Sequence, residues 1–282
     1  MINETVDLYE YFGIDRNGMD GGYLTPYISY LEEMSPRVRP AMLVLPGGGY
    51  GFVSEREGEP IAMRYAVEGF SAFVLRYSIF KKYPVPLLEA CMAVIYIREN
   101  ADKYHIDPDL VAAIGFSAGG HLAGMLANIF DEKEIRAVLG DKVELARINA
   151  VLLSYAVATL DVCTHGGSRD VITGGDKELM KRLSPEKRVT KNSPPAFIWH
   201  TYEDDCVPVE NSMRYADACL KNGVPFALHI FEKGWHGMSL VNREVNDGKP
   251  QDYAVAHVGK WFELSVDWLS ARGFTVKVKD KK

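Results

Sequence analysis

Residues 110–124 read LVAAIGFSAGGHLAG, and this stretch decides the fold. The apolar run from Leu110 to Phe116 has the length and continuity of a strand buried on both faces, which is typical of a parallel sheet. Small residues follow Ser117 and predict a helix that begins directly after this serine. A strand that enters a helix through one residue makes a sharp turn, and the glycines around Ser117 leave room for it.

Strands and helices alternate along the rest of the chain. Apolar runs predict further strands at residues 41–45, 71–77, 151–155, 196–200 and 227–231. Helical spacing predicts helices at about 54–68, 86–100, 209–222 and 253–269. Ser54 with Glu57 has the pattern of a capping box at the start of the first of these helices. The alternation predicts an α/β fold with a mostly parallel, doubly wound sheet and helices on both faces.

The chain divides into one large domain with smaller appendages. We expect the domain itself at residues 39–272, with residues 1–38 as a less regular extension packed on its core. The polar, glycine-rich segment 161–193 lies between two expected strands and is predicted to be a small cap or lid. Residues 273–282 form a charged tail, whose simplest interpretation is a solvated end.

Composition excludes several classes of function. The 282 residues carry a net charge of −6 and no basic stripe, so we expect no nucleic-acid partner. No run approaches the roughly 18 apolar residues of a membrane span, and the acidic, polar start from Met1 to Asp7 lacks the pattern of a signal peptide. The scattered cysteines form no CxxC pair or zinc spacing, which predicts a cytoplasmic protein without metal or cofactor. The composition does not indicate an oligomeric state.

The motif Gly115–Gly119, GFSAG, is the strongest chemical signal. Its position between a buried strand and a helix is the context of a nucleophile elbow, in which Ser117 projects at the carboxyl end of the sheet. The helix N-terminus beneath it favours negative charge that develops there. The alternative is a structural turn with an inert serine.

A serine nucleophile needs a base and an acid that orients the base. On this fold the acid follows a later strand, where Glu203, Asp204 and Asp205 stand in a row. The base follows the next strand, where glycines flank His236. The other histidines fit less well, because they lie in expected strands, in helices or in the cap, or, for His105, before the strand that leads to Ser117. The alternative for the acidic residues is a solvated turn that caps the next helix.

Consecutive glycines at residues 47–49 follow an early strand. They expose backbone N–H groups that can stabilise a tetrahedral oxyanion together with the N–H of Ala118. The alternative is a phosphate-binding loop, but neither a following Gly-Lys-Ser/Thr nor a GxGxxG pattern is present.

Several of these motifs together carry a family resemblance. They are LPGGGY at 45–50, SEREGEP at 54–60, GFSAGGHLA at 115–123, DDCVP at 204–208 and FEKGWHG at 231–237. Over residues 40–270 the chain resembles α/β-hydrolases of the esterase/lipase group, in particular bacterial acetylxylan-esterase-like and carbohydrate-esterase-like proteins. The resemblance implies the α/β-hydrolase fold, selects Asp204 over Asp205 as the acid, and assigns the oxyanion hole to Gly48 and Gly49.

The chain departs from relatives at two positions. Lipase-like relatives have histidine before the three glycines, whereas this chain has Pro46, which favours the carbohydrate-esterase-like branch. Many relatives have proline where this chain has Ala156, a change that reshapes the expected pocket wall.

The resemblance implies a serine esterase that acts through an acyl-enzyme, with Ser117, His236 and Asp204 as its triad. The expected substrate is a small ester, most simply a short saccharide such as a xylo-oligosaccharide that carries acetyl or other short acyl groups. Four aromatic residues are expected either to line the substrate pocket or to be ordinary core: Tyr50, Phe116, Tyr155 and Trp235. The alternatives are a general short-chain carboxylesterase, a serine peptidase or amidase, and an inactive ligand-binding protein.

Overall fold

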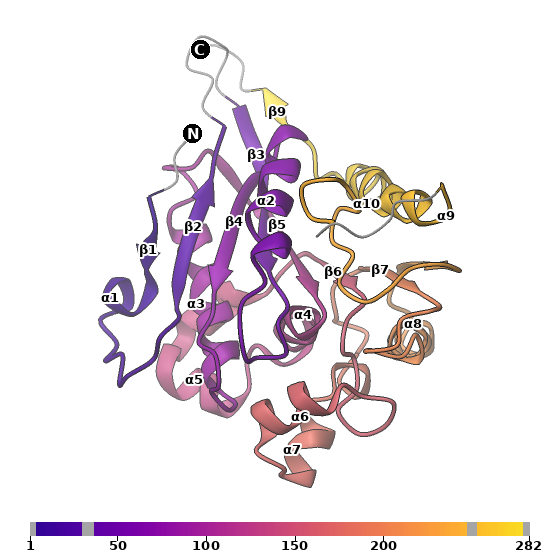
Figure 1. Ribbon diagram of the computed structural model, residues 1–282. Helices are drawn as coiled ribbons and strands as arrows, with labels where there is room; N and C mark the ends of the chain where they lie inside the picture. Colours follow the sequence, from indigo (N-terminus) through magenta and orange to yellow (C-terminus); the bar gives the residue numbers. More distant parts are fainter. Residues whose placement is uncertain (1–3, 30–36, 247–252, 279–282) are drawn as a thin grey trace.

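The computed structural model describes residues 4–29, 37–246 and 253–278. Its centre is a twisted sheet in the strand order β1-β2-β4-β3-β5-β6-β7-β8, with β9 paired to β3 outside this path. The neighbouring pairs from β4 through β8 are all parallel, as the alternation of strands and helices predicted. Helices cover both faces of the sheet (Figure 1).

The elements have the following bounds. The strands are β1 Val6–Asp7, β2 Tyr23–Tyr27, β3 Arg37–Leu45, β4 Ser71–Arg76, β5 Ile106–Phe116, β6 Ala150–Ser154, β7 Ala196–Thr201, β8 Phe226–Phe231 and β9 Lys277–Val278. The α-helices are α1 Leu8–Phe12, α2 Glu59–Val67, α3 Val85–Glu99, α4 Ala118–Ile129, α5 Lys133–Leu139, α6 Gly166–Thr173, α7 Lys177–Arg182, α8 Glu210–Lys221, α9 Tyr253–Ala256 and α10 Trp261–Ser270. Short 3₁₀ helices lie at Glu55–Glu57, Gly140–Ala146, Pro185–Lys187 and His257–Lys260.

The core has two layers, one on each side of the sheet. Alternation along β3 shows the division, because Leu43 and Leu45 belong to one cluster while Met42 and Val44 belong to the other. The first cluster includes apolar side chains of α3, α4 and α8, and the second includes those of α2 and α10. The strands are therefore covered on both faces, which explains their continuous apolar runs. Within the described residues, no helix combines the length and the apolar character that crossing a bilayer requires.

The expected helix at residues 54–68 is wrong at its start. Residues 55–57 form a short 3₁₀ turn, and α2 begins only after Gly58. The Ser54 side chain makes no capping bond, and the Glu57 carboxylate binds groups elsewhere in the fold. The capping-box pattern was misleading because the Glu57 carboxylate accepts hydrogen bonds from Gly47 and Tyr155 instead of from the start of a helix.

The two ends of the domain are more regular than the sequence indicated. Strands β1 and β2, which helix α1 separates in the sequence, extend the sheet, and β2 pairs antiparallel with β4. In the tail, Lys277 and Val278 pair with Val38 and Arg37, and the Lys277 ammonium contacts the Asp107 carboxylate at 2.7 Å. Lys277 and Val278 of the tail are thus paired in a strand although both are exposed, and residues 279–282 lie outside the described residues.

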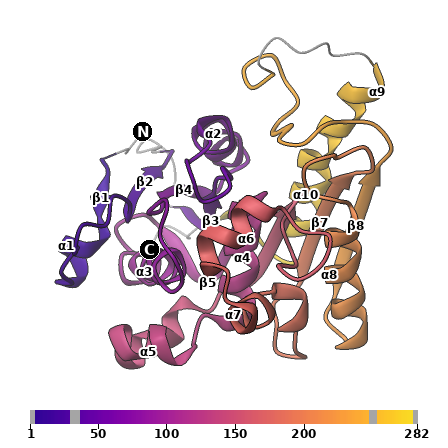
Figure 2. The same cartoon turned by 60° about the horizontal axis from the view of Figure 1, so that its bottom comes forward.

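The segment 161–193 contains α6 and α7 and lies at the carboxyl edge of the parallel strands (Figure 2). Ion pairs fasten it to the start of α5. Arg182 pairs with both Glu132 and Glu134, and Arg188 pairs with Glu132 at 2.6 Å. The Tyr83 hydroxyl donates to Glu134 at 3.0 Å. We call this segment the cap, and charged side chains connect it to the start of α5.

Candidate active site

Ser117 lies in the turn between β5 and α4 with φ 53° and ψ −118°, a conformation that is rare for a residue with a side chain. Its neighbours make this turn possible. A Cβ on Gly119 would lie 2.1 Å from the Leu45 carbonyl oxygen, and one on Gly115 would lie 2.1 Å from the Gly119 oxygen. The Ser117 N–H donates to the Ser154 carbonyl at 3.1 Å. The strand-to-helix turn that the glycine spacing predicted is present.

Ser117, His236 and Asp204 form a hydrogen-bonded chain. The Ser117 Oγ lies 2.8 Å from His236 Nε2, and His236 Nδ1 lies 2.7 Å from Asp204 Oδ2. The sequence left three acidic residues as candidates, and the other two lie elsewhere: Asp205 is exposed, and Glu203 pairs with Lys233 at 2.6 Å. The structure therefore brings together the three residues that the resemblance selected.

The Asp204 carboxylate is buried and fully hydrogen-bonded. Its Oδ1 accepts from the N–H groups of Cys206 and Val207 at 3.0 and 2.8 Å, and its Oδ2 also lies 3.2 Å from His200 Nε2. Burial alone would raise the pKa of Asp204, but hydrogen bonds from His200, His236 and the backbone hold it well below its usual value. The carboxylate thus stays ionised beside the imidazole that it orients.

The glycine loop after β3 curves over the same site. Gly48 and Gly49 have φ values of 123° and 63°, which favour glycine. The Gly48 carbonyl accepts from the N–H groups of Gly51 and Phe52, which closes a turn in the loop. The N–H groups of Gly48 and Gly49 have no partner within the described part of the chain. Ala118 begins α4, where the first N–H groups of a helix lack intrahelical acceptors.

A cavity of about 370 Å³ opens beside Ser117 and His236, and Gly48 and Gly49 form part of its wall. Further wall residues come from four segments, and the sequence analysis selected none of these side chains as pocket residues. They are Phe52, Arg56 and Glu57 after the glycine loop, Phe80 after β4, His165, Gly167 and Val171 of the cap, and Cys206 beside the acid. The cap therefore contributes one wall of the cavity.

The four aromatic residues expected at the pocket do not line this cavity. Tyr50, Phe116 and Tyr155 are almost completely buried. The Tyr50 hydroxyl bonds His121 Nδ1 at 2.7 Å, and the Tyr155 hydroxyl donates to Glu57 at 2.7 Å. Trp235 is partly exposed and packs against the apolar cluster beneath α10. Tyr50, Phe116 and Tyr155 therefore match the alternative of ordinary core, whereas Trp235 only packs against the core.

His165 is the cap residue that sequence reasoning missed. It caps the N-terminus of α6, where its Nδ1 accepts from the Ser168 N–H at 3.2 Å. Burial and the nearby His236 lower the pKa of His165, which disfavours the protonated ring. A histidine directly before a Gly-Gly-Ser start of a helix was the available signal, but only the fold shows that it faces the cavity.

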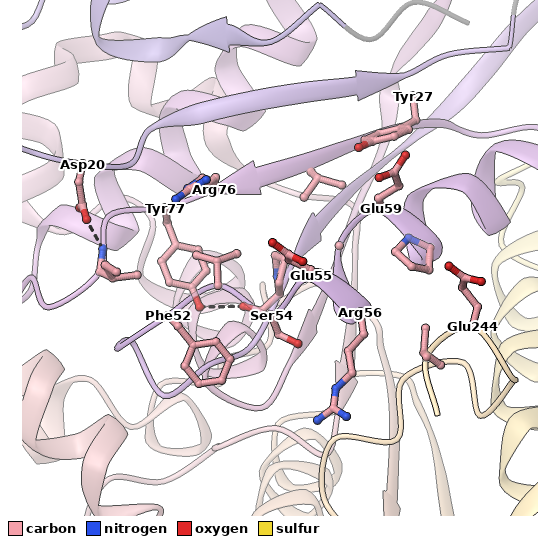
Figure 3. Close-up of a pocket in the computed structure, with 17 residues that line it drawn as sticks. Asp20, Tyr27, Phe52, Ser54, Glu55, Arg56, Glu59, Arg76, Tyr77 and Glu244 are labelled. Carbon is pink, nitrogen blue, oxygen red and sulfur yellow. Dashed lines mark hydrogen bonds between the residues drawn. The ribbon is translucent and has the colours of Figure 1, made fainter. Parts of the chain in front are cut away.

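A second, larger cavity of about 840 Å³ adjoins the first (Figure 3). Both cavities have Phe52, Ser54 and Arg56 in their walls. The larger groove has both apolar and polar walls, and its exposed charged side chains are Asp20, Glu55, Glu59, Arg76 and Glu244. Tyr77 lies in its wall and donates to the Pro46 carbonyl at 2.7 Å, which fixes the start of the glycine loop.

The chain is similar to a protein family and to several known hydrolases. The BD-FAE family matches residues 29–218. The chain is 40% identical over 238 residues to the endo-1,4-beta-xylanase B of Butyrivibrio fibrisolvens, covering 80% of this chain and 36% of that protein. It is 28% identical over 209 residues to the acetylxylan esterase of Xylanibacter ruminicola, covering 71% of this chain and 41% of that protein.

The chain spans less than half the length of these curated relatives. A solved structure matches it from end to end. This is the acetyl ester-xyloside bifunctional hydrolase from Caldicellulosiruptor lactoaceticus, with 33% identity, a TM-score of 0.80 and 97% coverage of both chains.

Proposed function

Because the chain belongs to the BD-FAE family and has the α/β-hydrolase fold, we propose that it is a serine esterase with Ser117, His236 and Asp204 as its catalytic triad. One observation carries this proposal, namely the hydrogen-bonded chain of these side chains at a cavity. A carboxylate only accepts hydrogen bonds, so Asp204 favours the His236 tautomer with its proton on Nδ1. Nε2 is then the acceptor for the Ser117 proton.

The first half of the reaction transfers the acyl group to the enzyme. Ser117 Oγ bonds to the ester carbonyl carbon while its proton moves to His236 Nε2. The carbonyl oxygen becomes an oxyanion, which the N–H groups of Gly48, Gly49 and Ala118 stabilise. The bond to the alcohol oxygen then breaks, and the leaving alkoxide takes the proton from His236. The Asp204 carboxylate stabilises the imidazolium while it carries the extra charge.

Water completes the reaction. His236 Nε2 takes a proton from a water molecule, whose oxygen bonds to the acyl carbon of the acyl-enzyme. The same N–H groups stabilise the second oxyanion. Its collapse breaks the bond to Ser117 Oγ, releases the carboxylic acid and returns the proton to the serine. Apart from the ester and the water molecule, these steps use only groups of the chain.

The proposed substrate is a small saccharide that carries acetyl or other short acyl groups, such as an acetylated xylo-oligosaccharide. The cavity of about 370 Å³ beside Ser117 suits a short acyl chain. The adjoining groove of about 840 Å³ has room for the alcohol part of the ester, and its charged walls offer hydrogen bonds to hydroxyl groups. The names of the acetylxylan esterase and the acetyl ester-xyloside hydrolase support the same substrate class.

The test is acetate release from acetylated xylo-oligosaccharides by the wild type and by Ser117→Ala. We expect fast release that falls by about 10⁴- to 10⁶-fold in the variant. If Ser117→Ala keeps most of the activity, the triad assignment is wrong.

Release from p-nitrophenyl acetate without release from the saccharide would instead indicate a general short-chain carboxylesterase. Cleavage of peptides without cleavage of esters would indicate a peptidase. Failure of an organophosphate to label Ser117 would favour an inactive ligand-binding protein.

A further inference from the structure

Glu57 is a buried carboxylate in the cavity wall that the proposed reaction does not use. Its side chain belongs to a residue only 3% exposed, although it faces the same cavity as Ser117. Each of its oxygens accepts one strong hydrogen bond. Oε2 accepts from the Gly47 N–H at 2.8 Å, and Oε1 accepts from the Tyr155 hydroxyl at 2.7 Å. No ion pair to Glu57 occurs among the described residues.

These bonds extend to a third segment. The Tyr155 hydroxyl, which donates to Glu57, accepts in turn from the Ser239 N–H at 3.1 Å. Ser239 lies three residues after His236, and its hydroxyl donates to the Arg56 carbonyl at 2.5 Å. Glu57 therefore connects the glycine loop after β3, the turn after β6 and the histidine loop after β8.

The glycine loop needs such a connection for a physical reason. Its three consecutive glycines have wide conformational freedom, so the directions of their N–H groups are not set by the chain itself. Binding of the Gly47 N–H to Glu57 fixes one peptide plane at the start of the loop. The following N–H groups, of Gly48 and Gly49, are the ones without partners at the cavity.

We propose that Glu57 is a positioning residue. Through Tyr155 it holds the glycine loop after β3, which we call the oxyanion loop, in a fixed position relative to His236. The role rests on the proposed esterase function and deepens it. Glu57 does not touch the reacting atoms. Its effect is on the transition state, because loosely directed N–H groups stabilise an oxyanion less than fixed ones while substrate binding elsewhere in the cavity is unchanged.

The test compares Glu57→Gln with Glu89→Gln. Glutamine offers one acceptor oxygen for two donors, so it cannot accept a hydrogen bond from both of them. Glu89 is a matched control because it is also buried and accepts from a tyrosine hydroxyl and a backbone N–H, those of Tyr9 and Ser78. It lines neither cavity. Both variants lose a similar buried bond, but only Glu57→Gln changes a side chain that binds the oxyanion loop.

The expected result for Glu57→Gln is a fall in kcat of about 10- to 100-fold on p-nitrophenyl acetate, with little change in KM. The affinity for a trifluoromethyl ketone, which mimics the oxyanion, should fall by the same factor. Tyr155→Phe, which removes only the link to the histidine loop, should show a smaller fall of the same kind. Glu89→Gln should lose stability and keep kcat.

Folded Glu57→Gln protein with the kcat and inhibitor affinity of the wild type would overturn the inference. So would an equal fall of kcat in Glu89→Gln, because the effect would then be one of stability. If Glu57→Gln fails to fold, Tyr155→Phe decides by the same readouts. Ser117→Ala separates the two proposals: an active Ser117→Ala defeats the esterase mechanism, whereas an inactive one with normal Glu57→Gln defeats only the positioning role.

Discussion

Two regions form the cavity, and different chemistry holds each of them. The loops at the ends of the strands are fixed by bonds between buried groups, of which Asp204, with a side chain 1% exposed, is the clearest example. The cap has a buried bond too, between His121 and the Leu183 carbonyl, but it is also fastened by ion pairs near the surface, where the Arg182 side chain is 27% exposed. A buried bond cannot be lost without leaving a costly unpaired partner, whereas surface ion pairs can open to water. We therefore expect the strand loops to determine the rate and the cap to determine how readily the cavity opens.

The largest effect should come from the strand loops, at Asp204. Asp204→Asn replaces an acceptor with an amide that can donate to His236 Nδ1, which favours the wrong tautomer. We expect kcat to fall by about 10⁴-fold. The neighbouring Asp205→Asn is the matched control, since its exposed side chain should leave kcat unchanged. Steady-state kinetics on p-nitrophenyl acetate measure both, and similar losses in the two variants would contradict the assignment.

An intermediate effect, on stability rather than on rate, should come from His121, which contacts both regions. Its Nε2 donates to the Leu183 carbonyl of the cap, and its Nδ1 accepts from the Tyr50 hydroxyl beside the glycine loop. Burial lowers the pKa of His121 to about 4. Between about pH 6.5 and pH 4 the unfolded chain therefore binds a proton that the folded protein does not, so stability falls with falling pH.

Urea unfolding at pH 7 and pH 5 measures this effect. From the pKa shift of His121, we expect a contribution of about 2 kcal/mol to the loss of stability between these pH values. His121→Gln can keep both hydrogen bonds but cannot take up a proton, so its loss of stability should be smaller by this amount. An equal loss in wild type and variant would show that other groups cause the acid sensitivity.

The smallest effect should come from the cap's ion pairs. Arg182→Met removes the contacts with Glu132 and Glu134 but keeps much of the apolar stem. We expect a loss of about 1 kcal/mol in stability and faster hydrogen exchange in residues 166–187, with no change near Ser117. Exchange measured by mass spectrometry checks this. Faster exchange at the strand loops as well would mean that the two regions do not open independently.

The same pairs give the cap a dependence on pH. The hydrogen bond from Arg182 holds the pKa of Glu134 down at about 2, against a usual value of 4.5. This stabilising contribution is present above the unfolded pKa of Glu134 and is lost as the pH falls toward the folded one. In Arg182→Met this part of the acid sensitivity should disappear.

The sequence predicted best where local geometry and chemistry coincide. The strand before Ser117 and the helix after it follow from an apolar run and glycines that no larger residue can replace. His236 and Asp204 could be placed because each follows a strand in a parallel sheet, and such strand ends meet at one edge. The choice between Asp204 and Asp205 required the family resemblance, because adjacent acidic residues differ only in what they face once folded.

The sequence predicted poorly where a side chain acts across the fold. Glu57 matched a local capping pattern, yet its partners are Gly47 and Tyr155, and the latter lies 98 residues away. The aromatic residues next to the motifs were expected at the cavity, but side chains near a buried strand end can as easily turn into the core. His165 reaches the cavity only because the cap folds back over the sheet, a tertiary arrangement that residues 161–193 do not specify locally.

The backbone strain at Ser117 limits how stable an active form of this domain can become. A side-chain-bearing residue with φ 53° and ψ −118° stores about 1–3 kcal/mol relative to a relaxed conformation. Glycine at position 117 would relieve most of that strain, but it has no hydroxyl with which to attack an ester. Selection for thermal tolerance alone would thus favour losing the nucleophile, and any improvement in melting temperature that keeps activity has to come from residues away from this turn.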